Sequence, residues 1–178
     1  VLSATILLGL LFIVYMGDRL LNSFLFRELA PESAPVFTYI LLFVGGVILW
    51  VIGNYMISAI NDGEGSLSNV YIMTAYALTP YLLITPVKIL LSYGLSLNEG
   101  FLIQILSILG IAWSAVNLFV GVMEMHAYTF RETIKNILLT LFFILIAVIV
   151  IAMMTMIWSK VAAFFEQIWG EAWFHVKK

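Results

Sequence analysis

Long intervals without a charged residue are the feature that most constrains how this chain of 178 residues can fold. Asp, Glu, Lys and Arg are absent from residues 1–17, 33–61, 65–87, 100–123 and 136–159. A helix needs about 20 mostly apolar residues to cross the hydrocarbon core of a bilayer, and four of the five intervals reach that length. A chain in lipid must satisfy its own backbone hydrogen bonds, and these runs are continuous rather than alternating, so we expect helices and not a barrel.

The composition excludes several classes of protein. Hydrophobic residues make up 63% of the chain and charged residues 10%, whereas an ordinary soluble domain carries roughly 25% charged residues. The formal net charge of −2 gives no indication of nucleic-acid binding. The chain has no cysteine, which excludes disulfides and thiolate chemistry. Since the sequence begins with Val1 and not with Met, we expect a further segment before it.

The intervals predict an all-α membrane protein with five transmembrane helices and an amphipathic, interfacial C-terminal helix. We expect the spans at about 1–16, 36–58, 69–93, 98–123 and 131–157, together forming a membrane domain over 1–158, with the amphipathic helix and tail over 159–178. Two S/T-x-x-E capping boxes, Ser96–Glu99 and Thr129–Glu132, mark the starts of the last two spans. The charged segment 17–35 is expected to lie at the membrane surface.

The final helix is predicted to have one aromatic face and one polar face. Its apolar residues recur at helical spacing from Val161 onward. The residues predicted to lie at the interface are Phe164, Phe165, Ile168, Trp169 and Trp173. Trp is typical of headgroup depth. Packing against the protein's own spans and docking on a partner subunit are the alternatives.

Few residues suggest chemistry, and no metalloprotease, nucleophile-elbow, Walker or dinucleotide motif is present. A metal site from the loop residues Asp62, Glu64, Glu124 and His126, with Arg131 beside them, is conceivable, but ion pairing and capping explain these residues more simply. Lys88 is the one charge inside a predicted span, and its long stem favours snorkelling to the interface over an intramembrane role. We therefore expect neither an enzyme nor a bound cofactor or metal.

Two prolines interrupt the third predicted span. Pro80 and Pro86 each remove a backbone donor and clash with the carbonyl four residues earlier, which predicts a bent or partly unwound helix. The hydroxyls of Thr79 and Thr85 are placed to satisfy the freed backbone groups. Transporters use broken helices to bind substrates, so a small transporter or channel is the alternative function, although no inverted repeat accompanies this span.

Small residues predict where helices approach one another. In the fourth span Gly110, Ser114, Asn117 and Gly121 share one face, and the second span contributes Gly46, Gly53 and Asn54. Small side chains let helix backbones come close, and Asn can hydrogen-bond across the contact. We interpret this face as internal packing, with a surface for a partner subunit as the alternative.

Several short motifs occur in order over roughly residues 40–150. They are Asn61-Asp62-Gly63-Glu64-Gly65, Ala77-Leu78-Thr79-Pro80-Tyr81, Leu91-Ser92, Asn98-Glu99-Gly100, Trp113, and Gly121 to His126-Ala127-Tyr128. In content and order these motifs resemble the Yip family, five-span membrane proteins whose eukaryotic members interact with Ypt/Rab GTPases. The motif residues of the resemblance are Asp62, Gly63, Glu64, Ala77, Leu78, Thr79, Pro80, Tyr81, Glu99, Trp113, His126 and Tyr128. The family's N-terminal cytoplasmic segment is the part that this sequence does not show in full.

The resemblance implies a bacterial plasma-membrane protein without catalytic activity. It suggests an accessory or scaffold subunit of a larger membrane complex, with an ABC-type transporter as the expected partner and the lipid bilayer around it. It assigns no chemical role to the motif residues. It also implies a cytoplasmic N-terminus, whereas the Lys and Arg residues are more numerous on the side of 17–35, 94–100 and the C-terminus. We follow the family and expect loops 61–68 and 124–131 to be cytoplasmic.

Overall fold

The computed structural model describes residues 1–23 and 36–176, with side chains described up to Trp169. The helices are α1 (Leu2–Leu20), α2 (Val36–Ile60), α3 (Leu67–Ala77), α4 (Thr79–Ser92), α5 (Gly100–Met125) and α6 (Phe130–Val176), with a 3-10 turn, η2 (Leu97–Glu99), before α5. These described residues contain no strand, so the predicted all-α class is confirmed. Five helical stretches are long and apolar enough to cross a membrane: Leu2–Leu20, Val36–Ile60, Leu67–Ser92, Leu97–Met125 and Phe130–Trp169.

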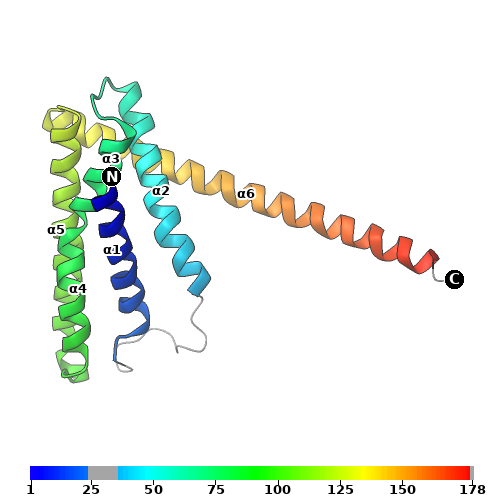
Figure 1. Cartoon of the computed structure of the whole chain (residues 1–178), viewed down its shortest axis with the longest axis horizontal. Coiled ribbons are helices and arrows are strands. Elements are labelled where there is room, and N and C mark those ends of the chain that lie inside the picture. The colour runs from blue at the N-terminus through cyan, green and yellow to red at the C-terminus, as the bar shows by residue number, and fades with distance from the viewer. Residues whose placement is uncertain (24–35, 177–178) are drawn as a thin grey trace. The chain divides into compact units, whose positions relative to one another are not determined.

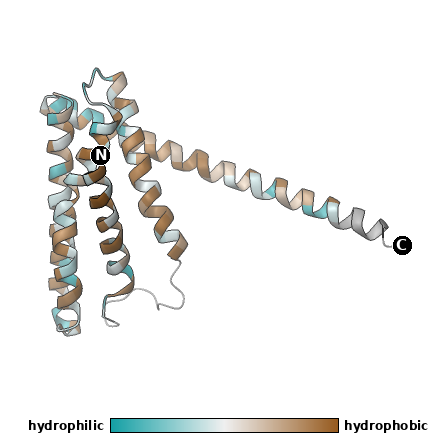
Figure 2. Cartoon of the chain, viewed as in Figure 1, coloured by the Kyte–Doolittle hydropathy of each residue, from teal (hydrophilic) through white to brown (hydrophobic). Residues whose placement is uncertain are grey.

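The chain forms two compact units, Val1–Thr140 and Leu141–Lys178. In the first unit α4 packs against α1 and α5, and α3 packs against α1, α2 and α5; Figure 1 shows α1, α4 and α5 running side by side. Hydrophobic residues cover most of α1 and α2 in Figure 2. The second unit is the continuation of α6. Every residue in it from Val148 to Trp169 is exposed.

The packed centre of the first unit is small. Ala4, Leu8 and Leu11 lie on one stripe of α1, at i, i+4 and i+7, and are buried together with Ala75 of α3. Phe43 of α2 packs against this group, and its ring lies 5.4 Å from that of Phe12. Apolar residues elsewhere are largely exposed, as expected where lipid rather than protein covers a helix.

Side-chain caps explain where several helices begin. Both predicted capping boxes are confirmed: the backbone N–H and hydroxyl of Ser96 lie 3.0 Å from Glu99 Oε2, and those of Thr129 lie 2.8 Å from Glu132 Oε2. Ser66 caps α3 by accepting from the N–H of Asn69. Each cap satisfies backbone N–H groups that a helix start would otherwise leave without partners.

The third span breaks once, at Leu78, which ends α3 and precedes α4. Pro80 lies in the first turn of α4, where its missing N–H costs little. The hydroxyl of Thr79 donates to the Tyr76 carbonyl at 2.6 Å, so the role predicted for Thr79 is confirmed. Pro86 lies inside α4 without ending it, and the second predicted break is therefore wrong.

Two predicted boundaries also differ from the structure. Helix α1 runs to Leu20 instead of ending at residue 16, which places Asp18 inside a membrane-spanning helix. Helix α6 is continuous from Phe130 to Val176, so no helix end separates a fifth span from a C-terminal helix near residue 158. The interfacial location of that last part stays a prediction. The rest of the predicted surface segment, 24–35, lies outside the described residues.

Candidate functional site

Buried polar side chains of the first unit gather at its two ends. The Asp18 cluster, made of Asp18, Asn22, Ser23, Tyr81, Lys88 and Ser92, lies where α1 and α4 end. The His126 cluster, made of Asn54, Ser58, Gly63, Gly65, His126, Tyr128, Asn136 and Thr140, lies where α2 and α5 end and α6 begins. Each cluster joins helices that are distant in the sequence.

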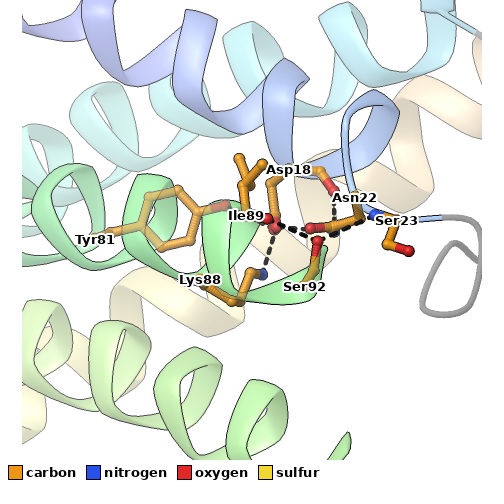
Figure 3. A network of polar contacts seen from close by, with 7 residues as sticks. All are labelled: Asp18, Asn22, Ser23, Tyr81, Lys88, Ile89 and Ser92. Atoms are coloured by element: carbon orange, nitrogen blue, oxygen red, sulfur yellow. Dashed lines mark hydrogen bonds and ion pairs between the residues drawn. The ribbon is translucent and has the colours of Figure 1, made fainter. Parts of the chain in front are cut away.

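Asp18 is the centre of the first cluster (Figure 3). One carboxylate oxygen forms an ion pair with the ammonium group of Lys88, and the other accepts from the hydroxyl of Tyr81 at 3.4 Å. The amide of Asn22 donates to the Asp18 backbone carbonyl at 2.6 Å and to Oδ1 at 3.3 Å. The carboxylate of α1 is thus satisfied mainly by side chains of α4.

A second tie between the same helices uses Ser92. Its hydroxyl accepts from the backbone N–H of Ser23 at 3.0 Å and donates to the Ile89 carbonyl at 2.7 Å. Gly17, next to Asp18, is buried, and a Cβ there would make an ordinary van der Waals contact with Ile89 at 3.6 Å. The Asp18 cluster therefore fixes the end of α1 against α4.

The prediction that Lys88 snorkels to the interface is wrong. Its side chain is only 8% exposed and is paired with Asp18, whose side chain is 13% exposed. An intramembrane ammonium is stable when a carboxylate compensates its charge. The sequence analysis missed this because it ended the first span before Asp18. Two opposite charges, each near the end of a different apolar run, were the available signal.

A cavity of about 770 Å³ adjoins this cluster. Its polar wall includes Asp18, Arg19, Tyr39, Lys88 and Gln104, and its apolar wall comes mostly from isoleucines of α5. The guanidinium of Arg19 lies 5.7 Å from the ring of Tyr15 and 6.0 Å from that of Tyr39. The wall carries two cations and one carboxylate.

The His126 cluster brings together the first and last motifs of the resemblance. His126 is 1% exposed. Its Nδ1 accepts from the backbone N–H of Gly65 at 3.2 Å, and its Nε2 lies 3.3 Å from Asn54 Oδ1. Because Nδ1 accepts, the proton of the neutral ring lies on Nε2 and is donated to Asn54. Burial lowers the pKa of His126, which agrees with this neutral form.

The network continues from Asn54 to the start of α6. The amide of Asn54 donates to Asn136 Oδ1 at 3.1 Å, and the amide of Asn136 lies 3.4 Å from the hydroxyl of Tyr128. That hydroxyl lies 3.3 Å and 3.2 Å from the carbonyls of Ser58 and Asn61. Burial raises the pKa of Tyr128, so its hydroxyl stays protonated and can donate to them.

Two glycines make this packing possible. A Cβ on Gly63 would lie 2.5 Å from the Tyr128 hydroxyl oxygen and 2.7 Å from His126 Nδ1. A Cβ on Gly65 would lie 2.6 Å from the ring of His126. The rings of His126 and Tyr128 stack with centroids 5.2 Å apart. The glycines of the loop therefore let its backbone lie directly against these rings.

The remaining predicted loop residues do not form a metal site in the described part of the chain, which has no group of three His, Cys, Asp or Glu residues placed to hold an ion. Asp62, Glu64 and Glu124 are exposed. Asp62 adopts a positive φ of 55°, a conformation that Asp tolerates better than most residues.

The small residues predicted for helix packing have different locations. Gly110, Ser114 and Gly53 are buried, and Gly121 and Asn117 are partly buried. Gly110 faces Ile84 and Tyr81 of α4, Gly121 faces Met73 of α3, and Ser114 Oγ accepts from the N–H of Tyr81 at 3.2 Å. Gly46 is exposed, and a Cβ there would meet nothing within 4 Å, so the structure does not place it in a helix contact.

The other predicted residues divide between helix ends and exposed surface. Ala77 and Pro80 are buried, and Leu78 and Thr79 partly buried, at the break of the third span. Glu99 closes its capping box, and Trp113 is 55% exposed on α5. Phe164, Phe165, Ile168 and Trp169 are exposed on α6, and the side chain of Trp173 is outside the described part. Asp18 and Asn136 were not among the predicted residues, and Asn54 was predicted only as a helix-packing residue of the second span.

A family model described as the Yip1 domain matches residues 1–164. No curated protein and no solved structure matches the chain.

Proposed function

The chain belongs to the Yip family, a family of multi-pass membrane proteins, and from this premise we propose that it is a non-enzymatic accessory subunit of a larger membrane complex. The observation that carries the proposal is how the buried polar groups are used. In both clusters they bind groups on other segments of the chain: Asp18 binds Lys88 of α4, and His126 binds Asn54 of α2 and Gly65 of the loop after α2. Such networks hold helices in place. The residues that they join do not include an activated nucleophile of the kind that catalysis requires.

The surface of α6 is the part that we propose for partner contact. From Val148 to Trp169 it is exposed, and most of it is apolar. In a bilayer such a helix can be covered by lipid or by another transmembrane helix. An ABC-type permease, the partner that the resemblance implies, would supply such helices.

Photocrosslinking tests this proposal directly. A photoreactive residue would replace Ile151, which is 52% exposed on α6, and in a control variant Val116, which is 59% exposed on α5. We expect a specific membrane-protein adduct from position 151 that mass spectrometry identifies, and only lipid adducts from position 116. A lone monomer after purification in mild detergent, with no protein adduct from position 151, would count against an accessory role.

A small transporter or channel is the second candidate, and the cavity beside Asp18 is the observation that favours it. Charged groups line the cavity, and Tyr81, in the first turn of α4 after the break, also contributes to its wall. The purified protein in liposomes should then produce a solute flux that Lys88→Met reduces. The absence of flux for ions, sugars and amino acids would leave the transporter hypothesis without support.

A further inference from the structure

We propose that the cavity beside the Asp18 cluster binds an uncharged glycerolipid such as diacylglycerol, whose hydroxyl and ester oxygens bind Gln104 and Ser107 while an acyl chain lies against isoleucines of α5. This inference goes beyond an accessory role and does not depend on any protein partner. It rests on which polar groups of the cavity wall already have partners, which do not, and where the latter lie along α5.

The charged groups of the wall are already bound to other groups of the protein. Lys88 is paired with Asp18 (Figure 3). Arg19 has partners too, among them the rings of Tyr15 and Tyr39. A charged ligand would have to compete with these contacts, and moving its charge out of water would cost further free energy. The wall therefore favours a ligand without net charge.

Three uncharged polar groups of the wall remain for a ligand. The Tyr39 hydroxyl, the Gln104 amide and the Ser107 hydroxyl belong to residues that line the cavity, and none of these groups forms a hydrogen bond with the described residues. Gln104 and Ser107 lie in a helical stretch that is apolar enough to cross the membrane, where an unsatisfied polar group is unfavourable. Hydroxyl and ester oxygens can satisfy them, because an amide both donates and accepts.

The position of these groups along α5 favours an uncharged head over a phosphate. Helix α5 begins at Gly100, so Gln104 and Ser107 lie about 6 Å and 10 Å along it, taking 1.5 Å per residue. Ile103 and Ile108 line the cavity beside them. A hydroxyl or ester group placed among isoleucines loses much less hydration free energy than a phosphate would.

The size and the apolar part of the cavity favour a lipid over a small polyol. Its volume of about 770 Å³ lies within the range of roughly 300–1,000 Å³ typical of small-molecule sites. Beyond Ser107 the wall continues with Ile108 and Ile111. These side chains offer a water-soluble polyol no hydrogen bond, whereas an acyl chain can pack against them.

Photolabelling of the whole chain in lipid nanodiscs tests the assignment. Diacylglycerol, phosphatidylglycerol and phosphatidylcholine, each with the same diazirine-bearing acyl chain, are added in turn at low concentration, and mass spectrometry measures labelling of the peptide that contains residues 100–111. We expect diacylglycerol to label it most. Gln104→Leu should reduce that labelling roughly three- to tenfold, the effect of about one lost hydrogen bond. Gln167→Leu, at the other glutamine of the chain and exposed on α6, is the matched control and should be labelled as the wild type is.

Two more variants separate hydrogen bonding from shape. Ser107→Ala removes a hydroxyl without filling space, so it should reduce the labelling by diacylglycerol and leave that by the two phospholipids unchanged. Ser107→Phe should reduce the labelling by all three lipids, because Ser107 lines the cavity and the larger ring would fill part of it. The melting temperature of each variant shows that the fold is intact.

Three results would overturn the proposal. One is labelling of the wild-type protein by either phospholipid that equals or exceeds labelling by diacylglycerol, and another is an equal loss in Gln104→Leu and Gln167→Leu. The third is displacement of diacylglycerol by millimolar glycerol, which would indicate a site for a water-soluble polyol. None of them depends on a protein partner, so failure here leaves the accessory-subunit proposal unaffected.

Discussion

Asp18 and Lys88 are opposite charges that are largely removed from water in the first unit. Removing two charges from water is unfavourable, and their attraction compensates only while both are present. Their direct ion pair, together with the Tyr81 hydroxyl and the Asn22 amide, satisfies the carboxylate within the bundle. The pair thus fixes how α1 and α4 meet.

A double-mutant cycle measures this coupling. We expect Asp18→Asn to lower the free energy of unfolding by about 3 kcal/mol, because it leaves a buried ammonium without its counterion. The double variant Asp18→Asn/Lys88→Met should lose less than the sum of the two single variants. Denaturant unfolding in mixed micelles provides the values. Additive losses would show that the two charges do not interact.

Gly63 is predicted to be intolerant of a side chain. A Cβ there would lie 2.5 Å from the Tyr128 hydroxyl oxygen, so Gly63→Ala must displace the ring or the loop, at a cost of about 1–3 kcal/mol. Gly46→Ala is the matched control, because nothing lies within 4 Å of that site and Ala is the better helix former. Thermal unfolding in detergent compares them, and equal melting temperatures would contradict the packing described for Gly63.

The His126 cluster predicts loss of stability in mild acid. Burial lowers the pKa of folded His126, whereas the unfolded ring takes up its proton near pH 6.5. Below about pH 6.5 the unfolded state therefore binds more protons than the folded state. The free energy of unfolding falls as the pH is lowered from about 6.5 to the lowered pKa of folded His126.

Melting temperatures between pH 7.5 and 5.5 test this. The wild-type protein should lose stability across that range, and His126→Gln should show a shallower slope because it does not titrate. His175→Gln, which removes the other histidine, is the control and should keep the wild-type slope. A wild-type slope in His126→Gln would assign the pH dependence to other groups.

At the scale of elements, the break in the third span is stabilised by a neighbouring helix. The Tyr81 N–H, which lies just after the break, donates to Ser114 Oγ of α5 at 3.2 Å. We expect Ser114→Ala to lower the free energy of unfolding by about 1–3 kcal/mol, since it leaves a buried donor unsatisfied. Ser159→Ala, at an exposed serine of α6, should be nearly neutral. Equal effects of both substitutions would show that Ser114 does not stabilise the break.

Local sequence signals predicted the elements well where the determinants were themselves local. The capping boxes at Ser96 and Thr129, the turn at Asp62-Gly63 and the break near Pro80 all follow from residues within a few positions. The end of α1 does not follow from nearby residues. Charge spacing alone excludes Asp18 from a span, and its burial is favourable only because Lys88, 70 residues later, pairs with it. Nor does any local pattern join Asn54 to Asn136.

The first unit as a whole is tied at both ends of its helices. The Asp18 cluster joins the ends of α1 and α4, and the His126 cluster joins α2, the loop after it and the start of α6. Between them the contacts are mainly apolar and rely on small residues such as Ala4 and Gly110. Since lipid gives apolar contacts little driving force, these polar ties should contribute much of the specificity of the fold.

The topology of the whole molecule gives the last prediction. Five spans place the loop containing Glu64 and the one containing Glu124 on one side of the membrane and the turn at Asn98 on the other. The chain has no cysteine, so single variants Glu64→Cys, Glu124→Cys and Asn98→Cys, all at exposed positions, carry one thiol each.

With a membrane-impermeant maleimide on intact cells, we expect Asn98→Cys to be labelled and the other two to be protected until the membrane is permeabilised. This follows from a cytoplasmic N-terminus, even though the Lys and Arg count favours the opposite orientation. The reverse pattern would keep five spans but invert the protein. Different labelling of Glu64→Cys and Glu124→Cys would be incompatible with five spans, because the third and fourth spans must return the chain to the same side.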